Sequence, residues 1–170
     1  PEHFEPTESP TKNVLNGADK NPLARFTKDP SVMLGDPKEF PIVATTYSVT
    51  EHWQTGTQTR NVPWLNELIP SNFIEISKEL ADEKGIKPGD KVRVWNRRGS
   101  VVVDAMITIR MKPQMINGVK THVVGLPHHF AWEGKFATGD NINDLTPNVG
   151  DPNSFIPEFK AFLVNVEKAA

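Results

Sequence analysis

Residues 86–103 read Ile86-Lys87-Pro88-Gly89-Asp90-Lys91-Val92-Arg93-Val94-Trp95-Asn96-Arg97-Arg98-Gly99-Ser100-Val101-Val102-Val103 and carry the clearest strand signal in the chain. The Pro-Gly-Asp turn leads into an alternating strand over residues 91–95. The chain then reverses at residues 96–99, where a glycine suits the positive φ of a hairpin turn. The return strand, residues 100–111, places apolar side chains on one face: Val101, Val103, Ala105, Ile107 and Ile109. We therefore predict a strand pair whose shared apolar face forms part of the core.

Further strands are predicted on both sides of this hairpin. Apolar or alternating runs predict strands at residues 42–47, 73–76, 121–126 and 161–166. Short helices are predicted at residues 62–69 and 78–84, the second with Ser77 as its N-cap and Gly85 at its C-terminal end. The long segment 127–160 is irregular, which is typical of a functional loop or one that covers a partner. The chain is thus predicted to be mainly β with short helices, most simply a closed barrel, because closure removes exposed sheet edges.

The chain divides into two parts by composition. Seven of the 15 prolines fall within the first 41 residues: Pro1, Pro6, Pro10, Pro22, Pro30, Pro37 and Pro41. Residues 1–40 show neither helical nor strand periodicity, and we expect an extended, proline-rich arm that is poorly ordered alone or lies across a neighbouring domain. Residues 41–170 are expected to form the barrel domain.

Composition excludes several classes of function. The formal net charge of -2 argues against a nucleic-acid-binding surface, which is normally basic. No apolar run has the length of a membrane span, so direct membrane insertion is not expected. The absence of cysteine excludes disulfides, thiolate metal ligands and a cysteine nucleophile. Because residue 1 is proline and not methionine, we expect the chain to be a piece of something larger.

A polar segment at residues 45–60 is the first candidate for a binding site. It holds hydroxyl groups, an imidazole, a glycine and an arginine but few aliphatic side chains, so it is poor core material. Arg60 suits phosphate because its guanidinium forms bidentate, charge-assisted hydrogen bonds, although a surface ion pair explains Arg60 alone equally well. His52 taken alone is more often a packing residue than a ligand. Together these residues predict a loop that binds a large, polar, anionic cofactor.

Two more polar segments follow predicted strands. Pro127-His128-His129-Phe130 comes directly after a strand end, where it could line a flat heterocycle or simply pack. A metal site is not expected, because neighbouring histidines point in different directions and no third ligand has suitable spacing. Residues 139–147 are dense in Asn and Asp, of which about half should form their own turns. The remaining amides could match the donor and acceptor edge of a guanine or pterin. No catalytic constellation is complete within the chain.

Four segments, in this order, resemble one known family. Residues 42–60, 85–111, 124–132 and 139–166 resemble the C-terminal domain of molybdopterin-dinucleotide oxidoreductases, and most closely that of the large subunit of respiratory formate dehydrogenases. The motifs that carry the resemblance are Thr45-Thr46-Tyr47, His52-Trp53, Thr55-Gly56, Thr59-Arg60-Asn61, Gly85-Ile86-Lys87-Pro88-Gly89-Asp90, Gly125-Leu126-Pro127-His128-His129-Phe130 and Leu145-Thr146-Pro147. Each motif is loose alone, and their order makes the resemblance specific.

The resemblance implies a fold and a cofactor. The family's C-terminal domain is a double-psi β-barrel that closes over the pterins of two molybdopterin guanine dinucleotides, which together hold molybdenum or tungsten. Carried over position by position, it implies cofactor contacts from Thr45, Tyr47, Glu51, His52, Thr55, Gly56, Thr59, Arg60, Pro127, His128, His129, Asn141, Asn143 and Lys160. Of these, Asn143 with Asn141 would bond a pterin edge, and Lys160 would reach the same region.

The resemblance also implies an enzyme that this chain does not complete. The family's metal-binding selenocysteine or cysteine, its partner histidine and the iron–sulfur cysteines belong to other domains, so the chain alone should not oxidise formate. The implied partners are the remainder of the catalytic large subunit, an iron–sulfur electron-transfer subunit and a membrane cytochrome subunit, and the implied location is periplasmic. Two alternatives stay open: a non-catalytic barrel that docks through residues 127–160, and the same domain of a nitrate or polysulfide reductase.

Overall fold

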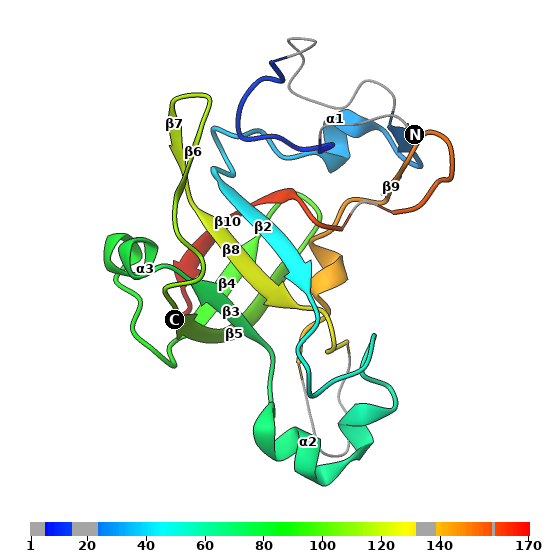
Figure 1. Cartoon of the computed structure of the whole chain (residues 1–170). Helices are drawn as coiled ribbons and strands as arrows, with labels where there is room; N and C mark the ends of the chain where they lie inside the picture. The colour runs from blue at the N-terminus through cyan, green and yellow to red at the C-terminus, as the bar shows by residue number, and fades with distance from the viewer. Residues whose placement is uncertain (1–5, 15–23, 132–138, 158) are drawn as a thin grey trace.

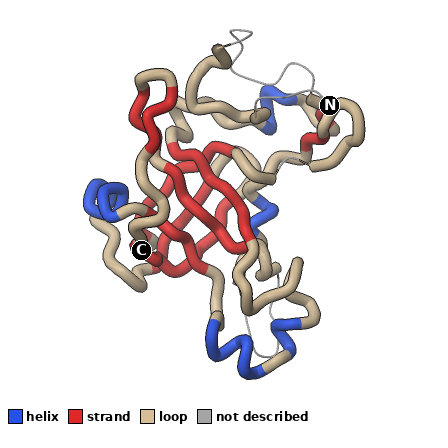
Figure 2. Tube along the Cα trace, in the orientation of Figure 1, coloured by secondary structure: helices blue, strands red, loops and turns tan. Residues whose placement is uncertain are grey.

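The computed structural model describes residues 6–14, 24–131, 139–157 and 159–170. Six strands form a closed barrel in the order β10-β2-β8-β3-β5-β4 (Figure 1 and Figure 2). Their bounds are Ile42–Tyr47 for β2, Phe73–Ile76 for β3, Lys91–Trp95 for β4, Ser100–Ile107 for β5, Val123–Pro127 for β8 and Phe162–Lys168 for β10. The pairs β2–β8 and β3–β5 are parallel, and the other pairs are antiparallel. The mainly β, double-psi barrel expected from the sequence is confirmed.

Alternation along the strands places the apolar core inside the barrel. Every second side chain of β4 and of most of β5 is buried, and these meet apolar side chains of the other strands, among them Ile42, Ile74, Ile76, Val124, Leu126, Val164 and Val166. The predicted apolar face of the return strand is correct as far as Ile107, which packs against this core. The prediction is wrong at Ile109, which is 85% exposed because β5 ends at Ile107.

Short helices cover the ends and sides of the barrel. The predicted helices are present as α2, Pro63–Leu68, and α3, Lys78–Lys84. The Ser77 hydroxyl accepts a hydrogen bond from Leu80 N at 3.0 Å, and Gly85 ends α3 with a φ of 65°. Two short 3-10 helices are η1, Thr59–Asn61, and η2, Ile142–Asp144. In Figure 1, α2 and its loops project from one end of the barrel.

An additional hairpin lies between β5 and β8. Its strands are β6, Gln114–Ile116, and β7, Val119–Thr121, which pair antiparallel. Asn117 and Gly118 form the turn with φ values of 49° and 79°, the positive values that a tight two-residue hairpin turn requires. The predicted strand 121–126 is therefore divided, because Thr121 ends β7 and β8 begins at Val123.

The described part of residues 1–40 folds against the barrel. It contains helix α1, Pro30–Met33, and strand β1, Arg25–Phe26, which pairs with β9, Val149–Gly150. Met33 and Leu34 pack with Val149 in a small second apolar cluster. The expectation of an arm without helix or strand is therefore wrong for these elements, because their partner lies after η2, where no local pattern indicates it. The segments 1–5 and 15–23 of the expected arm lie outside the described residues.

Candidate functional site

The loop that follows β2, residues 48–62, is held by its own polar side chains. His52 is 4% exposed, its Nδ1 lies 3.2 Å from Thr59 Oγ1, and its Nε2 lies 3.0 Å from the carbonyl oxygen of Ile69. Thr59 Oγ1 also accepts a hydrogen bond from Trp53 N at 3.0 Å. Both ring nitrogens of His52 are thus engaged within the protein. His52 and Thr59 position the loop, and the direct cofactor contacts expected of them stay a prediction.

The middle of loop 48–62 packs on the turn after β8. Gly56 is buried with a φ of 78°, and a Cβ at this position would lie 2.3 Å from the carbonyl oxygen of His129. Arg60 is 4% exposed, and its guanidinium carbon lies 5.9 Å from the centroid of the Phe130 ring. Burial lowers the pKa of Arg60 because it disfavours the charged form. Arg60 is therefore a buried part of this junction between the loop and the turn.

His129 is a fully buried member of the same junction. Its Nε2 accepts a hydrogen bond from Val49 N at 2.9 Å, and its Nδ1 donates to the carbonyl oxygen of Gln54. This arrangement requires the neutral ring with its proton on Nδ1, because Nε2 acts as an acceptor. Burial lowers the pKa of His129, the Gln54 carbonyl partly offsets this, and neighbouring positive groups lower it further.

Acid is expected to weaken this junction. Below about pH 6.5, the ordinary pKa of histidine, the unfolded chain binds a proton at His129 that the folded chain does not bind. The free energy of unfolding should therefore fall as the pH drops through this range toward the lowered folded pKa, and stay constant above it. Urea denaturation between about pH 5 and 8 measures this slope. His129→Gln should flatten it, apart from a residual contribution of His128, and an unchanged slope in the variant contradicts the assignment.

Four of the predicted site residues meet in one hollow beside the end of β2. This His128 hollow has a volume of about 280 Å³. Its walls come from β2, the loop after it, the turn after β8, η2 and the segment before β10, and the lining residues are Thr46, Gln54, Thr55, His128, Asn143, Phe159 and Lys160. Thr55, His128, Asn143 and Lys160 were predicted, whereas Thr46, Gln54 and Phe159 were not. Thr46 lies within the quoted Thr45-Thr46-Tyr47 motif, and Gln54 and Phe159 each adjoin a predicted residue.

Most polar side chains of the His128 hollow are open to a ligand. In the described part of the chain, the side chains of Gln54, Thr55 and Asn143 make no hydrogen bond, whereas His128 Nδ1 is buried and leaves only the other ring nitrogen for a ligand. Lys160 Nζ donates to the carbonyl oxygen of Thr46 at 2.6 Å, and an ammonium group has three donors.

The charge of the hollow is set by Lys160. Burial, and then the positive charge of Lys160, lower the pKa of His128, so its ring is neutral at neutral pH. A hollow with one ammonium, a neutral imidazole, two amides and two hydroxyls suits a ligand that is electron-rich and carries many hydrogen-bonding atoms.

The other predicted residues lie outside the His128 hollow. Tyr47 and Glu51 line a second hollow of about 400 Å³ beside β3. Thr45 and Pro127 belong to the barrel wall, where β2 pairs with β8. The structure therefore divides the predicted set among the His128 hollow, the second hollow, the buried loop junction and the barrel wall, and Asn141 lies apart from all of these.

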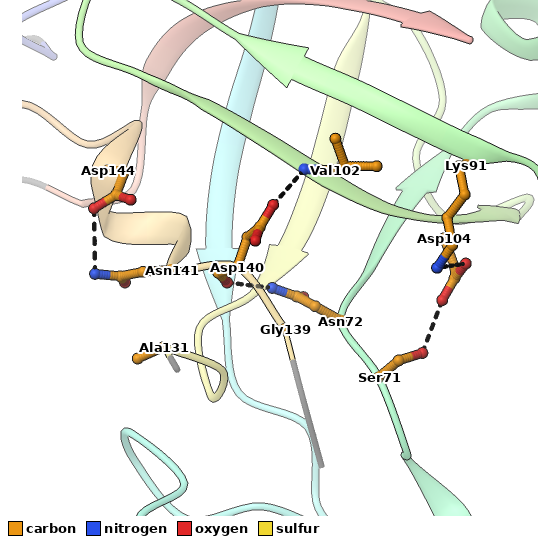
Figure 3. A pocket seen from close by; sticks show the side chains of 10 residues that line it. All are labelled: Ser71, Asn72, Lys91, Val102, Asp104, Ala131, Gly139, Asp140, Asn141 and Asp144. Atoms are coloured by element: carbon orange, nitrogen blue, oxygen red, sulfur yellow. Dashed lines mark hydrogen bonds and ion pairs between the residues drawn. The ribbon is translucent and has the colours of Figure 1, made fainter. Parts of the chain in front are cut away.

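Asn141 lines a third hollow, of about 470 Å³, whose polar groups largely satisfy one another (Figure 3). Asn141 Oδ1 accepts a hydrogen bond from Asn143 N at 3.1 Å, and its Nδ2 donates to Asp144 Oδ1 at 3.3 Å. Asp140 Oδ2 accepts from Val102 N at 2.6 Å. Asn141 thus caps its own short helix, as expected of part of the Asn and Asp residues in 139–147, and its amide oxygen and nitrogen each already have one partner in this segment.

The described residues hold neither a metal-binding cluster nor a membrane-spanning helix. No three His, Asp or Glu side chains among them are grouped as they would be to hold a metal ion. No helix in the described ranges combines the length and the apolar character that a membrane crossing requires.

The chain matches one protein-family model and several individual known proteins. A family model described as a molydopterin dinucleotide binding domain matches residues 42–163. The chain is 48% identical over 170 residues to the formate dehydrogenase subunit alpha of Megalodesulfovibrio gigas. It is 43% identical over 171 residues to the nitrate-inducible formate dehydrogenase major subunit of Escherichia coli strain K12. Each alignment covers 99% of the chain, which spans 17% of the length of these relatives.

A solved structure supports the fold independently. Acetylene hydratase from Pelobacter acetylenicus matches with a TM-score of 0.61 at 15% identity, over 78% of the chain and 19% of that protein. At this identity the likeness concerns the fold alone.

Proposed function

The chain belongs to the molydopterin dinucleotide binding domain family, and from this premise we propose that its His128 hollow binds part of a molybdopterin guanine dinucleotide. The observation that carries the proposal is the convergence of open polar side chains from separate segments: Gln54, Thr55, His128 and Asn143, with Lys160 beside them. Apart from the half-buried His128, these side chains are exposed, so they can exchange water for the donors and acceptors of a ligand without the protein having to open.

Each side chain has a role that follows from its chemistry. The Lys160 ammonium holds an anionic or electron-rich oxygen of the cofactor. The amides of Gln54 and Asn143 each offer a donor group and an acceptor, which suits the edge of a pterin ring. The neutral His128 ring offers its Nε2, because its Nδ1 is buried. The buried junction made by His52, Gly56 and His129 keeps the loop that carries Gln54 and Thr55 in place.

The proposal extends to the longer protein. The names of the matched relatives support a role for the chain as the C-terminal domain of a formate dehydrogenase large subunit. When bound, the metal-holding cofactor supplies the two-electron chemistry that converts formate to carbon dioxide, and this chain's residues bind and orient the pterins. The chain contains no cysteine, so a thiolate or selenolate metal ligand comes from the remainder of the large subunit.

Several finer points belong to the same proposal. The cofactor is in the guanine form, two copies bind, and the metal is molybdenum or tungsten. The partners are an iron–sulfur subunit and a membrane cytochrome subunit, and the location is periplasmic. Cell fractionation and metal analysis of the full-length protein test the location and the metal.

Loss of the Lys160 ammonium is expected to weaken cofactor binding roughly ten-fold or more, because a hydrogen bond to a charged group contributes about 1.5–3 kcal/mol. The test is Lys160→Met in the full-length protein. The measurement is the pterin content of the purified protein after dialysis, from the fluorescence of the oxidised, extracted pterin. Asn143→Ala should change the pterin content in the same direction and by less.

Lys78→Met is the matched control, because Lys78 lies on α3 with a side chain that is 78% exposed and pairs with Asp82. This control should retain the wild-type pterin content. A wild-type pterin content in the Lys160→Met protein would contradict the assignment of the His128 hollow.

A further inference from the structure

The second hollow, beside β3, contains a buried carboxylate with unmet hydrogen-bonding capacity. This Glu75 hollow has a volume of about 400 Å³. Glu75 lies on β3 and is 2% exposed. Its carboxylate lies 3.4 Å from Arg110 Nη1, which is an ion-pair distance but long for a hydrogen bond. Its Oε2 is buried and has no hydrogen-bond partner among the described residues.

A buried carboxylate in this state is costly for a fold. Taking the charge out of water requires compensation by hydrogen bonds as well as by an opposite charge. Buried polar atoms of native proteins have a partner in about nine cases of ten. Phe73, Ile74 and Ile76, the other residues of β3, are apolar and equally buried, so an apolar side chain would serve the barrel wall at position 75 without this cost. The orphaned oxygen therefore points to a donor that a ligand supplies.

The Tyr47 hydroxyl is a second buried polar atom at this hollow. It also has no hydrogen-bond partner in the described part of the chain. The nearby Glu75 carboxylate interacts with it by its charge and by a weak contact that lies outside ordinary hydrogen-bond geometry, so each group still lacks a good partner. Burial, and then Glu75, raise the pKa of Tyr47, so the hydroxyl keeps its proton and can donate. A carboxylate acceptor and a hydroxyl donor thus face one hollow.

Charge and shape restrict what the hollow can bind. Arg110 already supplies the positive charge that balances Glu75, so the missing donors can be neutral N–H groups. A carboxylate can accept two parallel N–H donors in its own plane. Phe73 and Met106 add apolar surface for the face of a flat ring. An aminopyrimidinone edge has a ring N–H beside an amino group, and ring acceptors next to them that the Tyr47 hydroxyl can reach.

We propose that the Glu75 hollow binds the aminopyrimidinone edge of the dinucleotide cofactor, with Glu75 accepting hydrogen bonds from its ring N–H and its amino group. Pterin and guanine share this edge. The inference rests on the proposed function and adds Glu75, which the sequence did not indicate, to the cofactor-binding residues. Tyr47 and Glu51 line this hollow, and residues of the segment 46–55 border both it and the His128 hollow.

Pterin and lumazine test the inference, because lumazine carries a carbonyl oxygen where pterin has its amino group. The cofactor-free full-length protein is titrated with each compound, and the quenching of ligand fluorescence gives the two dissociation constants. The wild type should bind pterin roughly ten-fold or more tightly than lumazine. Glu75→Gln should abolish this preference, because its amide places a donor against the donors of the ligand.

Glu79→Gln is the matched control and should keep the preference, since Glu79 lies on α3 and pairs with the half-exposed Lys120. Retention of the preference in Glu75→Gln overturns the inference. The preference compares two ligands in one protein, so a general loss of stability that weakens both equally does not imitate the expected result.

A different result contradicts the proposed function: purified wild-type full-length protein that contains no pterin at all. Wild-type protein that contains the cofactor but shows no preference for free pterin over lumazine overturns the Glu75 inference alone.

Discussion

Replacement of Glu8 with alanine is expected to lower the free energy of unfolding by about 3–5 kcal/mol, because it leaves a buried guanidinium without its carboxylate. The Glu8 side chain is fully buried, and that of its partner Arg98 is 9% exposed. Glu8 Oε1 accepts hydrogen bonds from Gly35 N at 2.6 Å and from Arg98 Nη1. Glu8 Oε2 accepts from Leu163 N at 2.6 Å and from Arg98 Nη2 at 3.0 Å. One carboxylate thus joins the segment before β2, the β4–β5 turn and β10.

Urea denaturation of the purified protein, followed by tryptophan fluorescence, measures this effect. The matched control is Glu39→Ala, which removes an ion pair with Arg97 at 3.0 Å whose side chains are 55% and 38% exposed. An exposed pair contributes at most about 1 kcal/mol, so the control should differ little from the wild type. Equal losses in the two variants would show that burial is not what makes the Glu8–Arg98 pair important.

Replacement of Gly56 with alanine is expected to separate loop 48–62 from the turn after β8. The φ of 78° costs an L-residue about 1–2 kcal/mol. The new Cβ would also lie 2.3 Å from the carbonyl oxygen of His129 and 2.8 Å from Arg60 Nε. Because the closer contact is with backbone, the loop must move, and we expect a total loss of about 3 kcal/mol or more. The pterin content should fall as well, since this loop carries Gln54 and Thr55 to the His128 hollow.

Gly85→Ala is the matched control for this substitution. Gly85 has a similar φ of 65°, but a Cβ there meets nothing within 4 Å. It therefore isolates the backbone cost, and the difference between the two variants measures the steric conflict. A Gly56→Ala protein with the stability of Gly85→Ala and a full complement of pterin argues against the junction described above.

The barrel was predictable because its signals are local. Alternation along residues 91–107 indicates both the strands and the side that faces the core, and Ser77 and Gly85 mark the ends of α3. The hairpin β6–β7 has a local signal too, in Asn117-Gly118, which the strands predicted above do not include. The Glu8–Arg98 pair had none. Ninety residues separate its members, and a lone glutamate in a proline-rich segment resembles any solvated residue.

The candidate site was predictable only in part, because the orientation of a polar side chain depends on contacts that are distant in the sequence. Thr55, His128, Asn143 and Lys160 do meet in one hollow. Whether a polar side chain faces a ligand or the protein depends on tertiary contacts, such as the Ile69 carbonyl that engages His52. The sequence could not indicate that Glu75 is buried. Alternation in Phe73-Ile74-Glu75-Ile76 suggests a solvent-facing charge, whereas the structure buries all four residues.

The barrel can close only after strand β10 has been synthesised. It pairs with β2 on one side and with β4 on the other, and it is the last of the six barrel strands in chain order. Until residues 162–168 leave the ribosome, β2 and β4 each present an unpaired edge, which is the feature that recruits foreign strands and leads to aggregation. Closure is therefore a late event in biosynthesis, and a nascent chain stalled before β10 displays an open sheet to chaperones and proteases.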